Sequence, residues 1–538
     1  MKIDLIDVSE WRLDSEHRIF PFGARDKKML WSPAEPPDGI KPNWPYLFKL
    51  SRKIYPDQYW MEVVAYIVGS HLKVDVPKAF PAVMYQNQEC KEGALLEWFY
   101  DVSEERFIHA SDYFKRVVTN FDNDKGKQHN IVDLIKICRM TVGKKFNWRE
   151  WLEDMLIFDS LIGNTDRHQE NWGIVFERVM EGLDRNVRLS AFFDNGTSLG
   201  HEHFPERVND WTLIKTYSYL IKGKHHLRHT QDDFENRVSH LDSIVKISKN
   251  THNRGRLCGM LNLDVCRMNQ EIDRLCTIET SVKFSPERSK SIKHLIFRRL
   301  NLIKLVLEMR KIEHVIKPNS LWLTWQPNPG ASRYLVGQFK SINGLVTFEY
   351  RTETSEFKKA QEKGFVGFPS FKINREVYED RVLEPFLRRL PPKSRTDFEE
   401  YLQSHMLPSN IKGNDLSLLA HTGAKFPGDG FCILPDLSSF NGKFEYLLEV
   451  AGTRYRDKAD FESISVGEPV DFVPEPENEY DENAIKIFHK AGHIGYVNRV
   501  LCEPLLQKIK KKKLVASIAK ISKIDENYSI YILLEVDD

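Results

Sequence analysis

The stretch Gly163-Asn164-Thr165-Asp166-Arg167-His168-Gln169-Glu170-Asn171-Trp172 contains an aspartate, Asp166, with an asparagine, Asn171, five residues later. A second aspartate, Asp194, follows residues 188–193, an apolar run that predicts a strand. A loop and a strand end can bring two carboxylates and an amide close together. The spacing therefore predicts a cluster of oxygen ligands in one site.

This set of side chains suits phosphoryl transfer. In-line transfer needs a carboxylate that accepts the hydroxyl proton, and oxygen ligands that hold Mg²⁺ against the β- and γ-phosphates. Asp166 would be the base, whereas Asn171 and Asp194 would bind the metal. Residues 148–161 predict a helix with one apolar face, which would hold the loop rigidly. We therefore predict a phosphotransferase that uses ATP and Mg²⁺.

The first hundred residues supply the other parts that a kinase needs to bind ATP. Lys49 lies in an expected strand, and Glu62 begins an apolar-periodic helix, which matches the pair that orients the α- and β-phosphates. Residues 23–28 form a glycine-containing basic turn that would cover phosphates with backbone N–H groups. An expected strand then runs into a hinge whose backbone would meet the adenine at Glu97, Trp98 and Phe99.

These residues resemble the HipA-like serine/threonine kinases of bacterial toxin–antitoxin systems. The resemblance is carried by the N-x-D-x-H-x-x-N loop at Asn164 to Asn171, by the Gly-Ala-x-x-Lys loop with Gly23, Ala24 and Lys27, and by Lys49 with Glu62. It implies a bilobal serine/threonine protein kinase core over residues 1–317, with the lobes divided near residue 100. His168 would support the catalytic loop beside the cofactor, without an acid–base role.

The resemblance also implies partners. Relatives phosphorylate proteins such as aminoacyl-tRNA synthetases, so the expected substrate is a synthetase or another translation factor. Relatives usually have a helix-turn-helix antitoxin encoded alongside. The expected role is that of a growth-arresting toxin or a phage-defence effector.

From about residue 447 the hydrophobic pattern changes to alternation, which predicts a small β-barrel over residues 438–538. The expected strands are 446–452, 469–473, 484–488, 494–497 and 528–536. This region resembles the HIRAN domain, which has an OB-like barrel and can hold the 3′ end of single-stranded DNA. By position, the DNA contacts would be made by Arg454, Tyr455, Tyr480 and Asp481. The alternative is a barrel that makes only protein contacts.

The middle region, residues 318–437, resembles the small domain that precedes the core in most HipA-like proteins. The resemblance is carried by Trp322, Val336-Gly337, Phe348 to Tyr350 and Leu416 to Gly430. Three strands are expected near 321–325, 335–339 and 345–350, then helices near 385–392 and 416–423. Before this region, Ser285-Pro286 predicts a helix start, and the periodic run that follows predicts an end near Lys317-Pro318. We expect the region to pack on the kinase and regulate it; the alternative is a passive spacer.

Composition supports a cytoplasmic multidomain α+β protein. The chain has 538 residues, too many for one core, and is 41% hydrophobic and 29% charged. No apolar run could span a bilayer, and no signal-peptide core follows Met1. Seven cysteines without a C-x-x-C pair indicate a reducing compartment and disfavour a zinc site. Two other functions remain open: a DNA-binding regulator or repair accessory with a silent kinase fold, and a lipid or small-molecule kinase.

Overall fold

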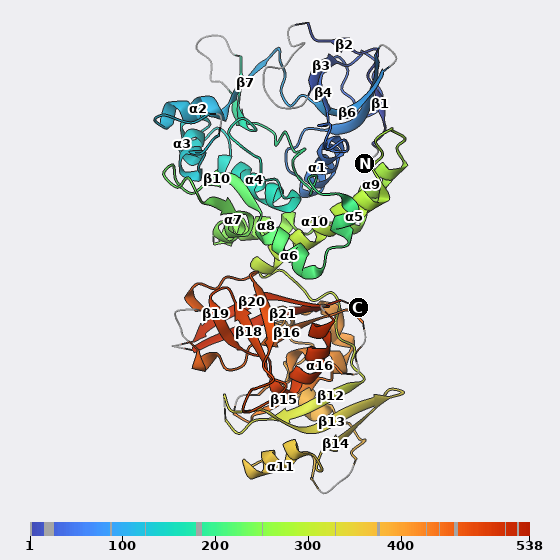
Figure 1. Cartoon of the computed structure of the whole chain (residues 1–538), viewed down its shortest axis with the longest axis vertical. Helices are drawn as coiled ribbons and strands as arrows, with labels where there is room; N and C mark the ends of the chain where they lie inside the picture. Colours follow the sequence, from blue (N-terminus) through green and yellow to red (C-terminus); the bar gives the residue numbers. More distant parts are fainter. Residues whose placement is uncertain are drawn as a thin grey trace. The chain divides into compact units, whose positions relative to one another are not determined.

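The computed structural model divides the chain into two compact units, Met1–Leu307 and Glu308–Asp538. Each unit combines helices and sheets, so the fold class is mixed α+β and multidomain, as the sequence predicts (Figure 1). The structure describes residues 3–15, 26–86, 89–123, 125–178, 186–249, 251–328, 330–373, 377–426, 428–438, 440, 442–456, 461–511, 513–524 and 527–537.

The first unit begins with a twisted sheet and one long helix. The strands lie in the order β1-β5-β6-β4-β3-β2, and their pairing is antiparallel except between β1 and β5. Helix α1 packs against β5 and β6. The bounds are β1 Ile6–Asp7, β2 Arg12–Leu13, β3 Lys27–Trp31, β4 Pro45–Leu50, α1 Tyr59–Leu72, β5 Ala79–Gln86 and β6 Glu89–Glu97.

In strand β4, alternate residues face the core and the second lobe. Tyr46 and Phe48 are buried in a hydrophobic core with Leu95 of β6. Leu47 and Lys49 instead line a cavity on the other face of the sheet. Successive side chains of a strand point to opposite faces, so this pattern places the single lysine of an otherwise apolar strand on the cavity side.

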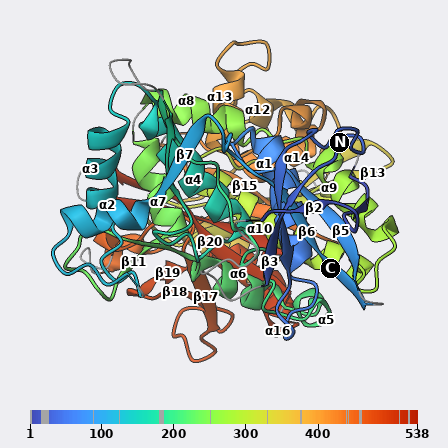
Figure 2. The same cartoon turned by 90° about the horizontal axis from the view of Figure 1, so that it is seen from above.

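The second lobe is built around helix α4, on which α7 and α10 pack. A small sheet of order β7-β8-β9 leads into the segment that carries Asp194. Helices α2 and α3 lie side by side at one edge of the lobe (Figure 1 and Figure 2). The bounds are β7 Glu105–His109, α2 Ala110–Val117, α3 Ile131–Thr141, α4 Trp148–Ile162, β8 Gly173–Glu177, β9 Val187–Leu189, α5 Pro205–Asn209, α6 Leu213–Ile221, β10 Lys224–Arg228, β11 Arg237–Ser239, α7 His240–Ser248, α8 Thr251–Met260, α9 Val265–Arg274 and α10 Pro286–Val306.

The residues that flank α4 set both of its ends. The Asn147 side chain accepts a hydrogen bond from a backbone N–H of the first turn. At the other end, Gly163 has a φ of 67°, and its N–H donates to the Asp159 carbonyl. This left-handed backbone angle favours glycine, and a Cβ at this position would also displace the Arg299 guanidinium, which lies 2.1 Å from where that Cβ would be. The helix therefore ends where the catalytic loop is predicted to begin.

Helix α10 ends earlier than the sequence predicts. Ser285 caps its start as expected, but the helix spans Pro286–Val306 and does not reach Lys317. Glu308 has a φ of 57°, a left-handed conformation that cannot continue a right-handed helix. The apolar residues beyond it that looked helical are used differently, since Ile316 is buried in the core of the C-terminal barrel.

The second unit contains an antiparallel sheet of order β14-β13-β12-β15. Four α-helices lie between β14 and β15 along the chain. Phe348 is fully buried in its core and packs on Phe339 and Phe371 at ring distances of 4.8 and 4.7 Å. Helices α11 and α13 were not predicted. The bounds are β12 Ser320–Trp325, β13 Tyr334–Ile342, β14 Leu345–Tyr350, α11 Ser355–Glu362, α12 Glu384–Leu387, α13 Phe398–Ser404, α14 Asp415–Thr422 and β15 Phe431–Pro435.

A second sheet in this unit curls into a barrel. Its strands lie in the order β16-β21-β20-β17-β18-β19, and an antiparallel bridge between Ala451 and Tyr496 joins the two outer strands. A Cβ on Gly495 would lie 2.4 Å from the Ala451 carbonyl oxygen, so this closure needs glycine. The bounds are β16 Phe444–Glu449, β17 Pro469–Pro474, β18 Ile485–His489, β19 Gly492–Tyr496, α16 Arg499–Lys510, β20 Leu514–Ile524 and β21 Asn527–Val536.

The middle region and the barrel share one hydrophobic core. Cys432 and Leu434 of β15 are buried in the same cluster as the barrel residues, and so is Ile316. Arg310 and Glu445 form an ion pair at the same junction, with 3% and 5% of their side chains exposed. Residues 308–538 therefore fold as one unit. Among the described residues, no helix is both long enough and apolar enough to cross a bilayer.

Candidate active site and nucleic-acid interface

A cavity of about 580 Å³ opens in the first unit between the sheet and the loops of the second lobe. This volume is typical of sites for small molecules and cofactors. Asp166 is not among the lining residues, and Gly23 and Ala24 lie outside the described part of the chain. The predicted site residues that line the cavity are Lys27, Lys49, Glu62, Glu97, Trp98, Phe99, His168, Asn171 and Asp194.

Lys49 joins three elements at the base of this cavity. Its Nζ lies 2.8 Å from Glu62 Oε1 and 2.6 Å from Asp194 Oδ1. Lys49 and Glu62 are 3% and 2% exposed, whereas Asp194 is 28% exposed. Because buried charges are tolerated only when they are paired, the lysine fixes strand β4, helix α1 and the Asp194 loop against one another.

The Asp194 loop is held by hydrogen bonds to its neighbours. Asp194 has a φ of 58°, an uncommon conformation for a residue with a side chain. The N–H of Asn195 donates to Glu62 Oε2 at 2.8 Å, so Glu62 contacts this loop through one carboxylate oxygen and Lys49 through the other. Asn195 Nδ2 donates to the Phe192 carbonyl at 2.7 Å. These contacts hold the loop in a conformation that directs Asp194 toward Lys49.

A buried arginine, Arg167, connects this loop to the loop after α4. Arg167 Nε and Nη2 donate to the two carboxylate oxygens of Asp159 at 3.1 and 2.7 Å. Nη2 also donates to Asn195 Oδ1 at 2.7 Å, and Nη1 donates to the Phe193 carbonyl. Burial raises the pKa of Asp159, and the guanidinium opposes that shift. One side chain therefore sets the spacing between the Asp166 loop and the Asp194 loop.

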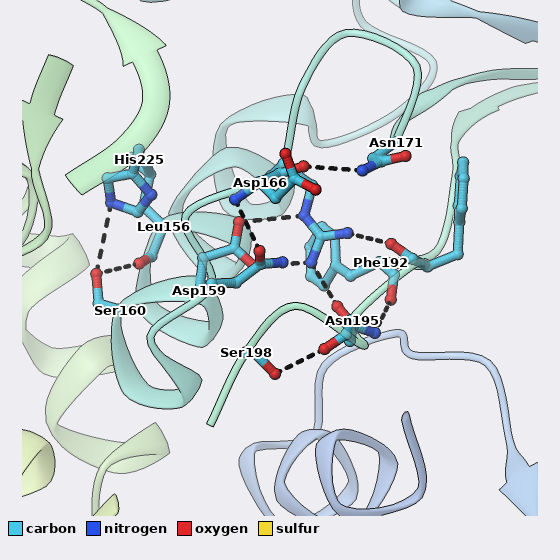
Figure 3. A network of polar contacts seen from close by, with 12 residues as sticks. Leu156, Asp159, Ser160, Asp166, Asn171, Phe192, Asn195, Ser198 and His225 are labelled. Carbon is cyan, nitrogen blue, oxygen red and sulfur yellow. Dashed lines mark hydrogen bonds and ion pairs between the residues drawn. The ribbon is translucent and has the colours of Figure 1, made fainter. Parts of the chain in front are cut away.

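The predicted catalytic loop is closed by its own polar groups. The N–H of Asp166 donates to Asn164 Oδ1 at 3.0 Å, and Asn171 Nδ2 donates to the Asp166 carbonyl at 2.8 Å (Figure 3). Because Nδ2 of Asn171 is used in this bond, the amide oxygen is the atom available to a cation. In the part of the chain that the structure describes, the half-buried Asp166 carboxylate forms no ion pair, so it is available to accept a proton.

Aromatic side chains form the wall next to the hinge. The Phe99 and Phe193 rings stack at 5.0 Å, and Phe107 meets Phe99 edge-on at 5.2 Å. The N–H groups of Glu97 and Trp98 already donate to the carbonyls of residues 78 and 45. The Phe99 N–H donates to no described residue. In this segment it is therefore the donor available to a nucleobase.

Sequence reasoning missed several residues of this site. His109 lines the cavity, and its Nδ1 lies 2.9 Å from the Glu170 carbonyl. Burial lowers the pKa of His109, which favours the neutral ring. Asp159 carried a detectable signal, because an aspartate among buried apolar residues of a helix needs a charged partner. Phe107 and Phe193 had no comparable signal.

The predicted DNA contacts are divided between a second cavity and its surroundings. Arg454 and Tyr455, in the short helical turn Thr453–Tyr455, line a cavity of about 750 Å³ in the second unit. Tyr480 is 86% exposed and lies outside the lining. Asp481 also lies outside, but its Oδ2 is 3.7 Å from Nε of Arg499, a lining residue.

Residues 443–537 match the HIRAN domain family. The matched residues form the barrel, so the HIRAN domain recognised from the sequence is confirmed. The molecule is thus a multidomain α+β protein whose first unit is bilobal and whose chain ends in a HIRAN domain. A search of curated protein sequences finds no match.

Solved structures similar to this chain include a kinase and a toxin. The proinflammatory kinase CtkA of Helicobacter pylori is 17% identical with a TM-score of 0.43, covering 55% of this chain and 94% of its own. HipA of the Shewanella oneidensis MR-1 toxin–antitoxin system is 12% identical with a TM-score of 0.26, covering 54% and 66%. The HIRAN domain of human HLTF is 19% identical with a TM-score of 0.15, covering 18% and 82%.

Proposed function

We propose that the first unit is a Mg-ATP-dependent serine/threonine protein kinase of the HipA-like type. The observation that carries this proposal is the placement of Lys49 between Glu62 and Asp194, in a cavity that Asn171 also lines. A lysine paired with a helix glutamate, beside an aspartate that can bind Mg²⁺, is the arrangement that protein kinases use for phosphoryl transfer from ATP.

The donor set fits both cofactors. An amide oxygen from Asn171 and a carboxylate from Asp194 are hard ligands of the kind Mg²⁺ prefers. The bound Mg²⁺ would neutralise charge that develops on the transferred phosphoryl group. Lys49 would bind the phosphates, and the stacked Phe99 and Phe193 would contact the adenine. Asp166 would accept the proton from the substrate hydroxyl, while Arg167 positions the two loops.

For the second unit we propose single-stranded DNA binding, with preference for a 3′ end. The HIRAN match supports this proposal, as does the exposure of Tyr455 and Tyr480, which are 75% and 86% exposed and free to stack on bases. Arg454 would contact a phosphate.

The whole protein would be a cytoplasmic kinase whose activity responds to DNA ends produced by damage or phage. It would act as a toxin or defence effector, and residues 318–437 or a helix-turn-helix antitoxin would inhibit it. Its substrate would be a translation factor such as an aminoacyl-tRNA synthetase.

The test is transfer of ³²P from γ-labelled ATP and Mg²⁺ to proteins of a bacterial lysate, with and without single-stranded DNA that has a free 3′ end. Wild type and Asp166→Ala are compared, with Asp242→Ala as an exposed control in the same unit. We expect a labelled substrate band that Asp166→Ala removes, that Asp242→Ala retains, and whose intensity DNA changes.

A second function is favoured by the HIRAN match alone: a DNA-binding regulator whose kinase fold is silent. Absence of labelling under all conditions, together with intact DNA binding, would establish this alternative. Labelling of lipid or a small metabolite in place of protein would instead assign the third class considered from the sequence.

A further inference from the structure

The cavity of about 750 Å³ in the second unit is built by two regions of the chain. The barrel contributes Arg454, Tyr455 and Tyr496, among others. The middle region contributes residues of the β12–β13 connection, including Arg333, and Lys425 after α14. The two regions share a hydrophobic core, so the cavity has a fixed wall on each side.

Arg333 is a half-buried cation without an acidic partner. Its Nη2 donates to Gln326 Oε1 at 2.8 Å, and its Nη1 donates to the Gly430 carbonyl at 3.1 Å and to Thr324 Oγ1 at 3.4 Å. All three acceptors are neutral, and within the described residues no carboxylate pairs with this guanidinium. The hydrogen bonds fix its position, but its charge is not neutralised, which favours an anionic ligand.

The other charges around the cavity do not compensate Arg333. The lining carboxylate, Glu449, already forms an ion pair with Lys425. His405 and His421 also line the wall, and burial lowers the pKa of both rings, that of His421 to about 3. Both rings are therefore neutral at pH 7, and the cavity keeps a net positive charge.

The middle region also comes close to a predicted DNA contact, Arg454. A Cβ on Gly330 would lie 3.1 Å from Nη1 of Arg454, so the β12–β13 connection runs against this guanidinium. Tyr455 stands exposed at the same cavity, and Tyr528 and Tyr531 of β21 line it. A flat aromatic group and an anion could therefore be bound side by side, which is the chemistry of a nucleotide.

We propose that this cavity is a composite nucleotide site, in which Arg333 of the middle region binds a phosphate of the terminal nucleotide and the barrel tyrosines hold its base. The site rests on the proposed DNA binding of the barrel and extends it, because it makes the middle region part of the DNA interface. A bound DNA end would then contact residues 318–437, the region expected to regulate the kinase.

The test measures affinity of the full chain for a 5′-fluorescein-labelled single-stranded oligonucleotide by anisotropy over a range of salt concentrations. Arg333→Gln is compared with Arg388→Gln, which removes the same charge from an exposed ion pair of the same region outside the cavity lining. Arg454→Gln reports on the barrel itself. Circular dichroism and thermal unfolding confirm that each variant is folded.

We expect Arg333→Gln to weaken binding about tenfold and to reduce the salt dependence by about one phosphate contact, while Arg388→Gln leaves both unchanged. Weak binding by Arg454→Gln with unchanged binding by Arg333→Gln would overturn the composite site and leave the barrel function intact. Absence of oligonucleotide binding by the wild type would overturn the proposed DNA function itself.

A free nucleotide carries the same phosphate and base as a strand end. Competition experiments distinguish these two ligands. Excess dAMP and closed circular single-stranded DNA are each added to the labelled complex. Weak competition by both supports a strand end in the cavity. Arg333-dependent binding of dAMP without oligonucleotide binding assigns the cavity to free nucleotides, and full competition by circular DNA overturns placement of a strand terminus there.

Discussion

The two cavities of this molecule hold their cations in opposite ways. In the first unit, Lys49 lies between two carboxylates, Glu62 and Asp194, within 2.8 Å of each. In the second unit, Arg333 is held by an amide, a hydroxyl and a carbonyl, all neutral. The lysine is paired within the folded chain before any ligand arrives, whereas in the proposed site the ligand would supply the counter-charge of the arginine.

This difference separates two kinds of site. A catalytic site must present its groups in fixed positions before the reaction, so its charges are paired and joined to rigid elements. A site that only binds an anion needs a positioned cation and a route for the ligand. Substitutions in the first cavity should therefore affect rate and stability, while those in the second should affect affinity and its salt dependence.

The largest effect is expected for Asp194→Asn, which removes a carboxylate that contacts Lys49 and would bind Mg²⁺. We expect phosphoryl transfer to fall by about 10³-fold, because a preorganised charge at the reacting phosphate is lost. DNA affinity should not change. The measurement is initial-rate ³²P transfer alongside anisotropy with labelled single-stranded DNA.

Asp242→Asn provides the matched control for this experiment, because it removes an exposed carboxylate from the same unit. It should retain full activity. Equal activity of Asp194→Asn and wild type would refute the metal-binding role and, with it, the proposed use of this cavity.

The next effect is expected for Arg167→Met, which leaves the fully buried Asp159 carboxylate without its partner. Removing one member of a buried ion pair costs about 3–5 kcal/mol, so the unfolding transition of the first unit should move to lower denaturant while that of the second unit stays in place. The double variant Asp159→Leu/Arg167→Met should recover much of this stability. It should not recover activity, because the contacts of Arg167 to Asn195 and Phe193 are still missing.

Some parts of the molecule follow from local sequence patterns. The strand with Lys49 and helix α4 were predicted because a short apolar run and a helical period are local signals, as was the helix with Glu62, which begins at Tyr59, three residues earlier than predicted. The HIRAN barrel was recognised for a similar reason, since its strands alternate and short turns separate them. The predicted catalytic residues Asp166, Asn171 and Asp194 come from one such pattern.

Other parts depend on contacts that no local pattern reports. Strand β20 was missed because it directly follows the lysine run at the end of α16, where the charges obscured the alternation of residues 514–524. The role of Arg167 depends on carbonyl and amide groups far away in sequence. Helix α10 ends early at the left-handed Glu308, and the later apolar residue Ile316 is buried in the barrel core, so a helical period there was misleading.

Two buried histidines, one in each unit, make the stability of their unit depend on pH. Burial lowers the pKa of His240 in the first unit and of His421 in the second to about 3. Between pH 6.5 and about pH 3 each histidine is protonated in the unfolded chain and neutral in the folded chain. The free energy of unfolding therefore decreases as pH falls through this window. The loss is about 1.4 kcal/mol for each pH unit per histidine.

Glutamine at either position preserves the hydrogen bond without the titration. His240 Nε2 donates to the Asn164 carbonyl at 3.1 Å, and His421 Nε2 accepts from the Ile316 N–H at 3.0 Å. Calorimetric Tm values between pH 7 and 4.5 should fall less steeply for the first unit in His240→Gln and for the second unit in His421→Gln. A pH dependence that is unchanged in both variants would contradict this assignment.

The smallest effect is expected for Glu356→Gln on helix α11. Glu356 Oε1 lies 2.9 Å from Nη2 of Arg499, which lines the second cavity, and both side chains are partly exposed. Such a pair contributes little to stability, about 0–1 kcal/mol. Removing the carboxylate should leave Tm unchanged and make Arg499 available to phosphate, which raises DNA affinity about two- to threefold at low salt and not at high salt.

Glu353→Gln, an exposed neighbour, is the control for the change in net charge. Lower affinity in Glu356→Gln would mean that the ion pair orients Arg499 toward the ligand, and an equal gain in Glu353→Gln would attribute the effect to net charge alone.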